Sequence, residues 1–357
     1  MGGDAENTIF INSGRTAKAG KGNQVGRRIQ FDNALLSTLK DEFKDDIEFI
    51  TARVNKNVVA SYKGEKNNYS LRAVNPDHQF IEKSELVSGR FINQRDLQES
   101  TKVIVIGRLV KEDLFKTEKV IGEYIDLNKI QYKVVGVYQD IGDDNEERII
   151  YMPLTTAQRI YGNNDYIDQI NLTYNLSMGL DNAIALGTNI ESRIKKIFNV
   201  EPSDQRAVRL RNRATEANSI NQFNSVLTIL VLIIGLGTLI AGIVGISNIM
   251  IFIVKERTKE IGIRKALGAP PRSIQSIILI ESVLITSISG YVGLLLGIGI
   301  LEAYGPSLDK YFITDPSVST NLVAMATLAL IISGFIAAYV PAKRASQIKP
   351  IIALRDE

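Results

Sequence analysis

Three long apolar segments in the second part of the chain limit what this sequence can fold into. They span residues 223–254, 274–301 and 322–340, and the first carries no charge before Lys255. A helix needs about 20 mostly apolar residues to cross a hydrocarbon core of ~30 Å. Short polar loops separate the segments, so we predict three transmembrane helices rather than core helices of one large soluble protein. The residues before 222 are polar and rich in turns, which predicts a separate soluble domain.

Basic residues predict the orientation of these spans, because cytoplasmic loops carry an excess of Lys and Arg. The loop after the first span and the tail after the third are basic, whereas loop 302–321 has only Lys310 against three acids. The basic residues are Lys255, Arg257, Lys259, Arg264, Lys265 and Arg272 in the loop, and Lys343, Arg344, Lys349 and Arg355 in the tail. We therefore expect a cytoplasmic C-terminus and an extracytoplasmic N-terminal domain.

That orientation requires a signal or a span ahead of the N-terminal domain. Residues 1–7 contain neither a basic nor an apolar region, and residues 8–12 already have the pattern of a strand. We therefore expect a fourth span upstream of this sequence.

The first 200 residues alternate strand and helix patterns, which predicts an α+β domain with mainly antiparallel pairing. Strands are predicted at 8–12, 47–54, 57–62, 69–74, 102–106, 124–127, 131–138, 149–152 and 167–174, and helices at 32–44, 109–115, 155–161 and 178–198. Asp32 has the position of an N-cap for the first helix. The predicted fold is thus an α+β extracytoplasmic domain, residues 1–200, followed by an all-α transmembrane bundle, residues 223–357.

Between these two parts, residues 201–222 contain four arginines, Arg206, Arg209, Arg211 and Arg213, and we find no strand pattern there. We predict a stalk helix that runs from the domain into the membrane. A loose juxtamembrane linker is the alternative.

The residue types exclude several chemistries. The chain has no Cys, which excludes disulfides, thiolate metal ligands and Cys nucleophiles. Its single histidine, His78, lacks the partners of a metal site or a catalytic triad, so we interpret it as a surface residue. No G-x-x-x-x-G-K-[ST] motif occurs, so ATP is expected to bind another subunit. We expect no catalytic, cofactor-binding or metal site in this chain.

Two further segments have a functional and a simpler interpretation. The acidic segment 139–148 is either a calcium loop or a solvated loop, and its spacing, which lacks the EF-hand pattern, favours the solvated loop. Gly20, Gly22 and Gly26 are interpreted as part of a flexible loop.

The segment 248–269 is the most informative in the chain. It leaves the bilayer and continues as a short charged helix with apolar residues at Ile261, Ile263, Ala266 and Leu267. We expect Gly262 to interrupt this helix and Gly268 to end it, before Pro270 and Pro271 break the chain. Such a helix at a cytoplasmic turn suits docking into a partner's groove. The alternative is a basic anchor and no more.

The run from Glu256 to Ala269, ERTKEIGIRKALGA, resembles the signature of the MacB/FtsX family of ABC transporter permeases. Other stretches also resemble this family: Glu281 with Gly290, Gly293 and Gly297; Pro341-Ala342-Lys343-Arg344-Ala345 with Pro350 and Ala353-Leu354-Arg355; and, in the MacB-like outer domain, Gly89-Arg90-Phe91, residues 103–107 and Val134-Val135-Gly136-Val137. The resemblance covers nearly the whole chain, and the missing first span is the departure from it.

The resemblance implies a coupling helix at about 256–269 that docks on a cytoplasmic ABC ATPase, which holds the ATP and Mg²⁺. The coupling residues it implies are Glu256, Arg257, Glu260, Ile261, Gly262, Ile263, Arg264, Ala266, Leu267 and Gly268, and the helix-packing glycines are Gly290, Gly293 and Gly297. It also implies a homodimer or heterodimer of permeases in the bacterial cytoplasmic (inner) membrane, a periplasmic adaptor or other envelope protein, contact with lipid, and no nucleic acid.

For function, the resemblance implies a non-catalytic subunit for export or mechanotransmission, with lipoproteins, peptides or antibiotics as substrate classes. An FtsX-like regulator that activates a cell-wall hydrolase or a signalling partner is the alternative. A passive membrane-anchored binding protein is a third hypothesis, which the coupling-helix signature disfavours. Glu281 stands alone in its span, so we expect it near the cytoplasmic interface or bonded to a neighbouring helix, rather than in a proton relay.

Overall fold

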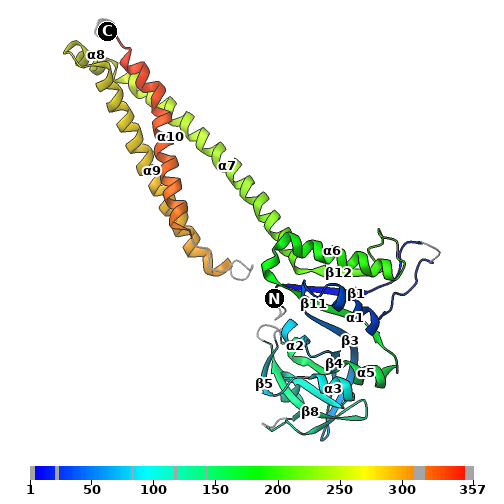
Figure 1. Ribbon diagram of the computed structural model, residues 1–357. Coiled ribbons are helices and arrows are strands. Elements are labelled where there is room, and N and C mark those ends of the chain that lie inside the picture. The colour runs from blue at the N-terminus through cyan, green and yellow to red at the C-terminus, as the bar shows by residue number, and fades with distance from the viewer. Residues whose placement is uncertain are drawn as a thin grey trace. The chain divides into compact units, whose positions relative to one another are not determined.

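The computed structural model describes residues 5–20, 24–82, 84–115, 119–140, 144–308 and 318–349. The chain divides into two compact units, Met1–Phe223 and Asn224–Glu357 (Figure 1). We call them the outer unit and the membrane unit. Gly22, Pro350 and residues 353–355, which the sequence singled out, lie outside the described residues.

The outer unit is built on a mixed sheet of ten strands with helices packed around it. Its strands are β1 (Thr8–Ser13), β2 (Phe31–Asp32), β3 (Ile47–Tyr62), β4 (Glu65–Val74), β5 (Glu85–Gly89), β6 (Val103–Gly107), β7 (Tyr124–Leu127), β8 (Ile130–Gln139), β9 (Ile149–Pro153), β10 (Tyr166–Ile167), β11 (Gln169–Tyr174) and β12 (Val208–Asn212). Its helices are α1 (Asn33–Glu42), α2 (His78–Ile81), α3 (Gln94–Glu99), α4 (Arg108–Phe115), α5 (Leu154–Tyr161) and α6 (Leu180–Ile197), with 3₁₀ turns at Glu146–Arg148 and Leu176–Met178.

The main sheet has the order β12-β1-β11-β3-β4-β9-β6-β8-β5, with β7 beside β3 and β8, while β10 and β2 form a separate pair. Among the described strands, only the pairs β4–β9 and β6–β8 are parallel. The α+β class with mainly antiparallel pairing is therefore confirmed. Asp32 caps α1 as predicted, because its Oδ1 accepts a hydrogen bond from the Leu35 N–H at 2.8 Å.

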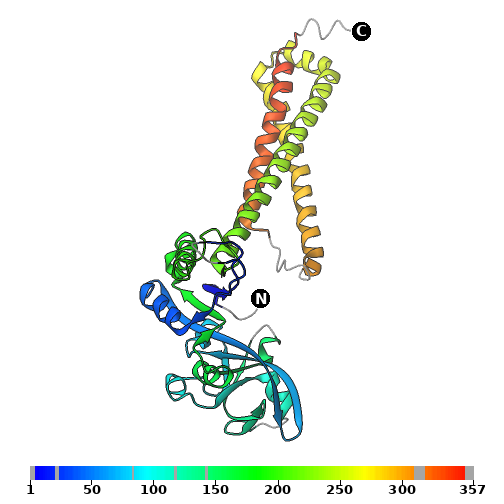
Figure 2. The same ribbon diagram turned by 90° about the vertical axis from the view of Figure 1, so that its right-hand side faces the viewer.

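One long strand replaces two predicted ones. We expected strands at 47–54 and 57–62, but β3 continues through Asn55, Lys56 and Asn57. These polar residues are exposed, yet their backbone stays in register with β4 from Arg53↔Val74 to Tyr62↔Glu65. The unbroken ladder of hydrogen bonds outweighs the local polarity. Figure 2 shows β3 and β4 as a long blue ribbon.

A close backbone approach explains one glycine of the MacB-like stretches. Gly136 on β8 lies opposite Gly89 on β5. A Cβ atom at Gly136 would lie 2.2 Å from the carbonyl oxygen of Arg90, well inside van der Waals contact. Only glycine therefore fits here without moving the two strands apart.

The prediction for residues 201–222 is wrong in part, because residues 208–212 form strand β12. This strand pairs antiparallel with β1, from Ile9↔Asn212 to Ser13↔Val208. The signal was the alternation Val-Arg-Leu-Arg, in which Val208 is buried while Arg209 and Arg211 are exposed. The predicted helix begins only at Arg213.

Asn212 joins this strand to the helix that follows without an intervening loop. Its Oδ1 accepts from the Ala214 N–H at 2.9 Å and its Nδ2 donates to the Ala183 carbonyl on α6 at 2.8 Å. Asn212 thus caps the helix and also ties its start to α6.

Four helices follow: α7 (Arg213–Glu256), α8 (Thr258–Ala266), α9 (Pro271–Leu308) and α10 (Thr320–Ser346). By length and composition α7, α9 and α10 are able to cross a membrane, and they cover the three predicted spans. The third and fourth pack along each other through small residues. Gly334 of α10 lies against Thr286 of α9, where an added Cβ would meet the Thr286 side chain at 3.0 Å. Small residues at such a contact let two membrane helices approach closely.

Candidate functional site

The chain between α7 and α9 forms a short helix with sharp ends. The first helix stops at Glu256, and Arg257 has non-helical dihedral angles before α8 begins at Thr258. At the other end Gly268 has a φ of +97°, and the Ala269 N–H donates to the Arg264 carbonyl at 3.0 Å. This is the Schellman arrangement, which favours glycine at that position. Gly268 therefore ends the helix as predicted, whereas Gly262 does not interrupt it and instead lies buried within it.

The inner face of α8 packs on the ends of all three long helices. Ile261 is only 8% exposed and belongs to a cluster with Met250 and Val254 of α7, Ile274 and Ile278 of α9, and Ala342 and Ala345 of α10. One apolar cluster therefore joins α8 to all three long helices.

Polar contacts add to this apolar anchor. Lys265 Nζ donates to the carbonyl of Ser346, the last residue of α10, at 2.8 Å and to that of Ile348, two residues beyond the helix, at 2.7 Å. A lysine is favourable there because it satisfies carbonyls that have no partner within the helix.

Arg257 connects the start of α8 to α9. Its Nη1 lies 3.3 Å from both carboxylate oxygens of Glu281, and the two side chains are 52% and 30% exposed. An ion pair this exposed contributes about 0–1 kcal/mol, so it orients rather than stabilises. The expectation that Glu281 bonds to a neighbouring helix is confirmed. Figure 1 shows α8 beside the C-terminal end of α10.

The outer face of α8 has an apolar patch toward its C-terminal end, and no other residue of the described chain covers it. Leu267 is 83% exposed and Ile263, one turn before it, is 44% exposed. Glu260 and Arg264 flank them and pair with each other at 2.6 Å, while Glu256 and Ala266 are also exposed. An exposed Leu next to an exposed Ile on a short charged helix is typical of a docking surface.

The three glycines predicted for helix packing differ in their surroundings. A Cβ at Gly290 would lie 2.6 Å from Leu330 of α10, so this glycine lies at the α9–α10 contact. Gly293 and Gly297 have no atom of the described residues within 4 Å of such a Cβ, and neither have the glycines of α7 at 235, 237, 242 and 245. The expectation that helices pack at Gly293 and Gly297 therefore stays a prediction, because no described residue contacts these positions.

The interpretation of His78 as a surface residue is wrong. Its side chain is fully buried, edge-on to the Tyr151 ring, and its Nε2 lies 3.0 Å from Glu82 Oε2. Glu82 is itself buried, accepts from the Tyr151 hydroxyl at 2.6 Å, and pairs with Arg53 and Arg72. Burial, and then the charges of Arg53 and Arg72, hold the pKa of His78 well below 6.5. A histidine that stays neutral here is a structural residue, which packs the start of α2 against Tyr151 of β9.

Two carboxylates of the acidic segment 139–148 are already paired. Glu146 Oε1 accepts from Arg72 Nη2 at 3.0 Å, and Glu147 pairs with Arg108 at 2.5 Å. These pairings correct the solvated-loop interpretation for the end of this segment, and residues 141–143 lie outside the described residues. In the part of the chain that is described, no three His, Asp or Glu side chains gather as metal ligands.

The fold and α8 together define a class of protein: a membrane subunit with a mixed-sheet domain ahead of its apolar helices. Family models match both parts, the MacB-like periplasmic core domain at residues 2–185 and the FtsX-like permease C-terminal domain at residues 225–350. The chain belongs to the MacB/FtsX-type ABC transporter permeases.

Individual relatives agree with this assignment. The chain is 29% identical over 356 residues to the macrolide export ATP-binding/permease protein MacB of Bdellovibrio bacteriovorus, covering 98% of this chain and 53% of the relative. It is 28% identical over 322 residues to the ABC transporter permease YknZ of Bacillus subtilis, covering 88% and 76%. The chain therefore spans about half the length of the MacB relatives.

A solved structure supports the fold of the outer unit. The periplasmic region of MacB from Actinobacillus actinomycetemcomitans superposes with a TM-score of 0.50 at 19% identity, covering 61% of this chain and 94% of that one. The similarity establishes the fold alone.

Proposed function

We propose that this chain passes ATP-driven motion from an ABC ATPase to the outer unit, for export or mechanotransmission. The two faces of α8 carry the proposal. Ile261 and Lys265 fasten the inner face to the long helices, while Ile263 and Leu267 leave an apolar outer face for a partner.

The partner that best fits this outer face is the nucleotide-binding subunit, which would hold the ATP and Mg²⁺. A small apolar centre flanked by Glu260 and Arg264 suits a groove with an apolar floor and a polar rim. Two copies of the permease with two ATPases are part of the proposal, as is the cytoplasmic side for α8, which the basic residues around it favour. Lipoproteins, peptides and antibiotics remain the proposed substrate classes.

Association with the ATPase is the test. The tagged full chain is co-expressed with an ABC ATPase supplied as a separate chain, purified through the tag and reconstituted in lipid. We measure how much ATPase is recovered with the permease and its ATPase activity. We compare the wild type with the double variant Ile263→Asp and Leu267→Asp. Both residues are exposed, so the fold tolerates the change while the apolar docking centre is lost. Arg257 is less suitable for this test, because changing it also breaks its contact with Glu281.

Leu176→Asp is the matched control, since Leu176 is 66% exposed but lies in the outer unit. We expect the wild type and the control to retain the ATPase and the double variant to lose it. The proposal is wrong if the wild type captures no ATPase, or if the double variant captures as much as the wild type.

A further inference from the structure

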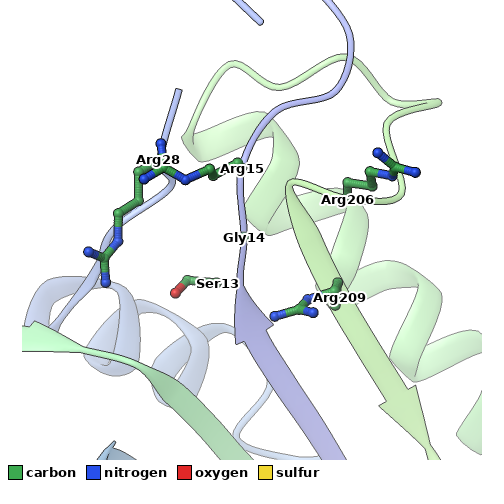
Figure 3. A pocket seen from close by; sticks show the side chains of 6 residues that line it. All are labelled: Ser13, Gly14, Arg15, Arg28, Arg206 and Arg209. Carbon is green, nitrogen blue, oxygen red and sulfur yellow. The ribbon is translucent and has the colours of Figure 1, made fainter. Parts of the chain in front are cut away.

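Four arginines line an open pocket in the outer unit that the proposed function does not use. The pocket has a volume of about 540 Å³ and is lined by Ser13, Gly14, Arg15, Arg28, Arg206 and Arg209. Figure 3 shows Arg15 and Arg28 on one side of Gly14, and Arg206 and Arg209 on the other. We call it the arginine pocket.

Three segments of the chain, around Gly14, Arg28 and Arg206, form the arginine pocket, and backbone hydrogen bonds join them. The Gly14 N–H donates to the Ala207 carbonyl, and the Gly14 carbonyl accepts from the Ile29 N–H, each at 2.9 Å. The chain at Arg206 comes so close that a Cβ on Gly14 would lie 2.0 Å from the Arg206 carbonyl oxygen. Glycine is thus needed at the centre of the pocket, and the backbone that carries the four arginines has a defined geometry.

Asp204 fixes the segment that carries Arg206. This buried carboxylate accepts from the backbone N–H groups of Ala17 at 2.7 Å, Lys18 at 3.0 Å and Arg206 at 2.9 Å. Burial alone would raise the pKa of Asp204, but these N–H donors outweigh it and lower the pKa. The carboxylate therefore stays ionised and is occupied by backbone donors.

The arginine pocket has positive charge without matching negative charge. Within the described ranges, none of its four guanidinium groups has a carboxylate within 4 Å. Asp168, whose carbonyl accepts from Ser13, uses its carboxylate to accept from the Asn55 N–H at 3.0 Å. Arg72, Arg90 and Arg108, by contrast, each pair with an acid. Four exposed cations around one pocket repel each other, and a bound anion would relieve that repulsion.

A phosphate group is the anion that best matches these side chains. The guanidinium group presents a planar fork of donors that fits phosphate oxygens in pairs, and several such groups suit an anion with more than one acceptor oxygen. The pocket also lies close in the sequence to the first apolar stretch. Arg209 is four residues before α7, and ten residues, ~15 Å of helix, lead from Arg213 to Phe223, where that stretch begins.

From this charge, geometry and position we infer that the arginine pocket binds a phosphate-bearing group. The group belongs either to the headgroup of an anionic phospholipid or to a soluble phosphorylated ligand, and the same four arginines recognise both. This site is separate from α8, so it does not depend on the proposed ATPase contact.

The test uses the full chain in neutral detergent and two probes, inorganic pyrophosphate and short-chain phosphatidylglycerol, with short-chain phosphatidylcholine as the zwitterionic comparison. Binding is measured by isothermal titration calorimetry for the wild type and the double variant Arg28→Gln and Arg209→Gln. Arg95→Gln with Arg159→Gln is the matched control, because it removes the same charge from exposed positions on α3 and α5. Hydrogen exchange of β1 and β12 checks that the pocket variant keeps its fold.

We expect at least tenfold weaker binding of one or both anionic probes to the pocket variant, and no change in the control. Binding of phosphatidylglycerol alone identifies a lipid headgroup, and binding of pyrophosphate alone identifies a soluble ligand. The inference is overturned if neither anionic probe binds the wild type, if phosphatidylglycerol is the only anionic probe that binds and phosphatidylcholine binds as tightly, or if the pocket and control variants weaken binding equally.

Discussion

The outer unit is expected to lose stability in mild acid because of one residue. His78 is the only histidine in the chain, and in the folded protein its pKa is well below 6.5, through burial and then through Arg53 and Arg72. In the unfolded chain its pKa is about 6.5. Below pH 6.5 the unfolded chain therefore binds a proton that the folded chain does not, and the free energy of unfolding falls as the pH falls.

The size of this effect follows from linkage. One proton taken up only by the unfolded chain changes the free energy of unfolding by at most about 1.4 kcal/mol per pH unit. Between pH 7.5 and pH 5.0, with a reference pKa of 6.5 and a folded form that stays neutral, the loss sums to about 2 kcal/mol. Stability is thus fully present above pH 6.5 and is lost progressively toward the lower pKa of the folded state.

The assay compares the wild type with His78→Gln, in which the side chain is neutral at both pH values. Hydrogen exchange of the β4 and β9 amides, measured for the full chain in lipid nanodiscs, reports the free energy of opening around the site. We expect the wild type to lose about 2 kcal/mol more than the variant between pH 7.5 and 5.0. Carboxylates that begin to titrate near pH 5 cancel in this difference.

Equal losses in the two proteins would refute the reasoning. An independent check is the proton resonance of the single imidazole, which is expected to show no titration in the folded protein between pH 7.5 and 5.0. A midpoint near 6.5 would mean that burial and the charges of Arg53 and Arg72 do not lower the pKa of His78, for instance because the Glu82 carboxylate offsets them.

Three further predictions rest on other contacts. Leu267→Ala removes about three apolar carbon groups from a side chain that is 83% exposed, so the affinity for the ATPase in a binding titration is expected to fall about 30-fold, the equivalent of about 2 kcal/mol. Leu296→Ala, at an exposed position in α9, is the control and is expected to leave this affinity unchanged. Equal effects of the two substitutions would contradict a docking role for Leu267. Tyr151→Phe removes the buried 2.6 Å hydrogen bond to Glu82 without opening a cavity, and is expected to cost about 2 kcal/mol in a denaturant titration of the outer unit; no loss would mean that water replaces the hydroxyl. Gly136→Ala forces β8 against the Arg90 backbone and is expected to cost about 1–3 kcal/mol with faster exchange of the β5 and β8 amides. Unchanged exchange would show that the strands part freely.

The features that were predicted correctly from the sequence are those that depend on residues close together in the chain. The three spans depend on the length of an apolar run, and the end of α8 depends on Gly268 with the prolines after it, so a single segment contains the whole signal. The cap at Asp32 is likewise a matter of adjacent residues.

Features set by distant segments could not be predicted in this way. The burial of His78 depends on Tyr151, which bonds to Glu82 from 69 residues away in the chain, while the parallel pairing of β4 with β9 sets Tyr151 opposite Arg72. The anchoring of Lys265 depends on carbonyls some 80 residues later in the chain. Strand β12 was not predicted for a different reason. The alternation of apolar and polar residues was present in its sequence, but its arginines were interpreted as part of a helix.

The junction between β12 and α7 has a mechanical consequence. Asn212 ends the strand and Arg213 starts the helix, so there is no slack chain in which a pull or a twist on the helix could dissipate. The side chain of Asn212 holds the first turn of the helix to α6, and its strand is bonded along its length to β1. A force applied to the helix is therefore distributed over the hydrogen bonds of the strand and the contact with α6, so the connection is rigid and not flexible. Several glycines inserted after Asn212 would form a flexible linker between the strand and the helix, and displacements of α7 shorter than that linker would no longer be transmitted to the sheet.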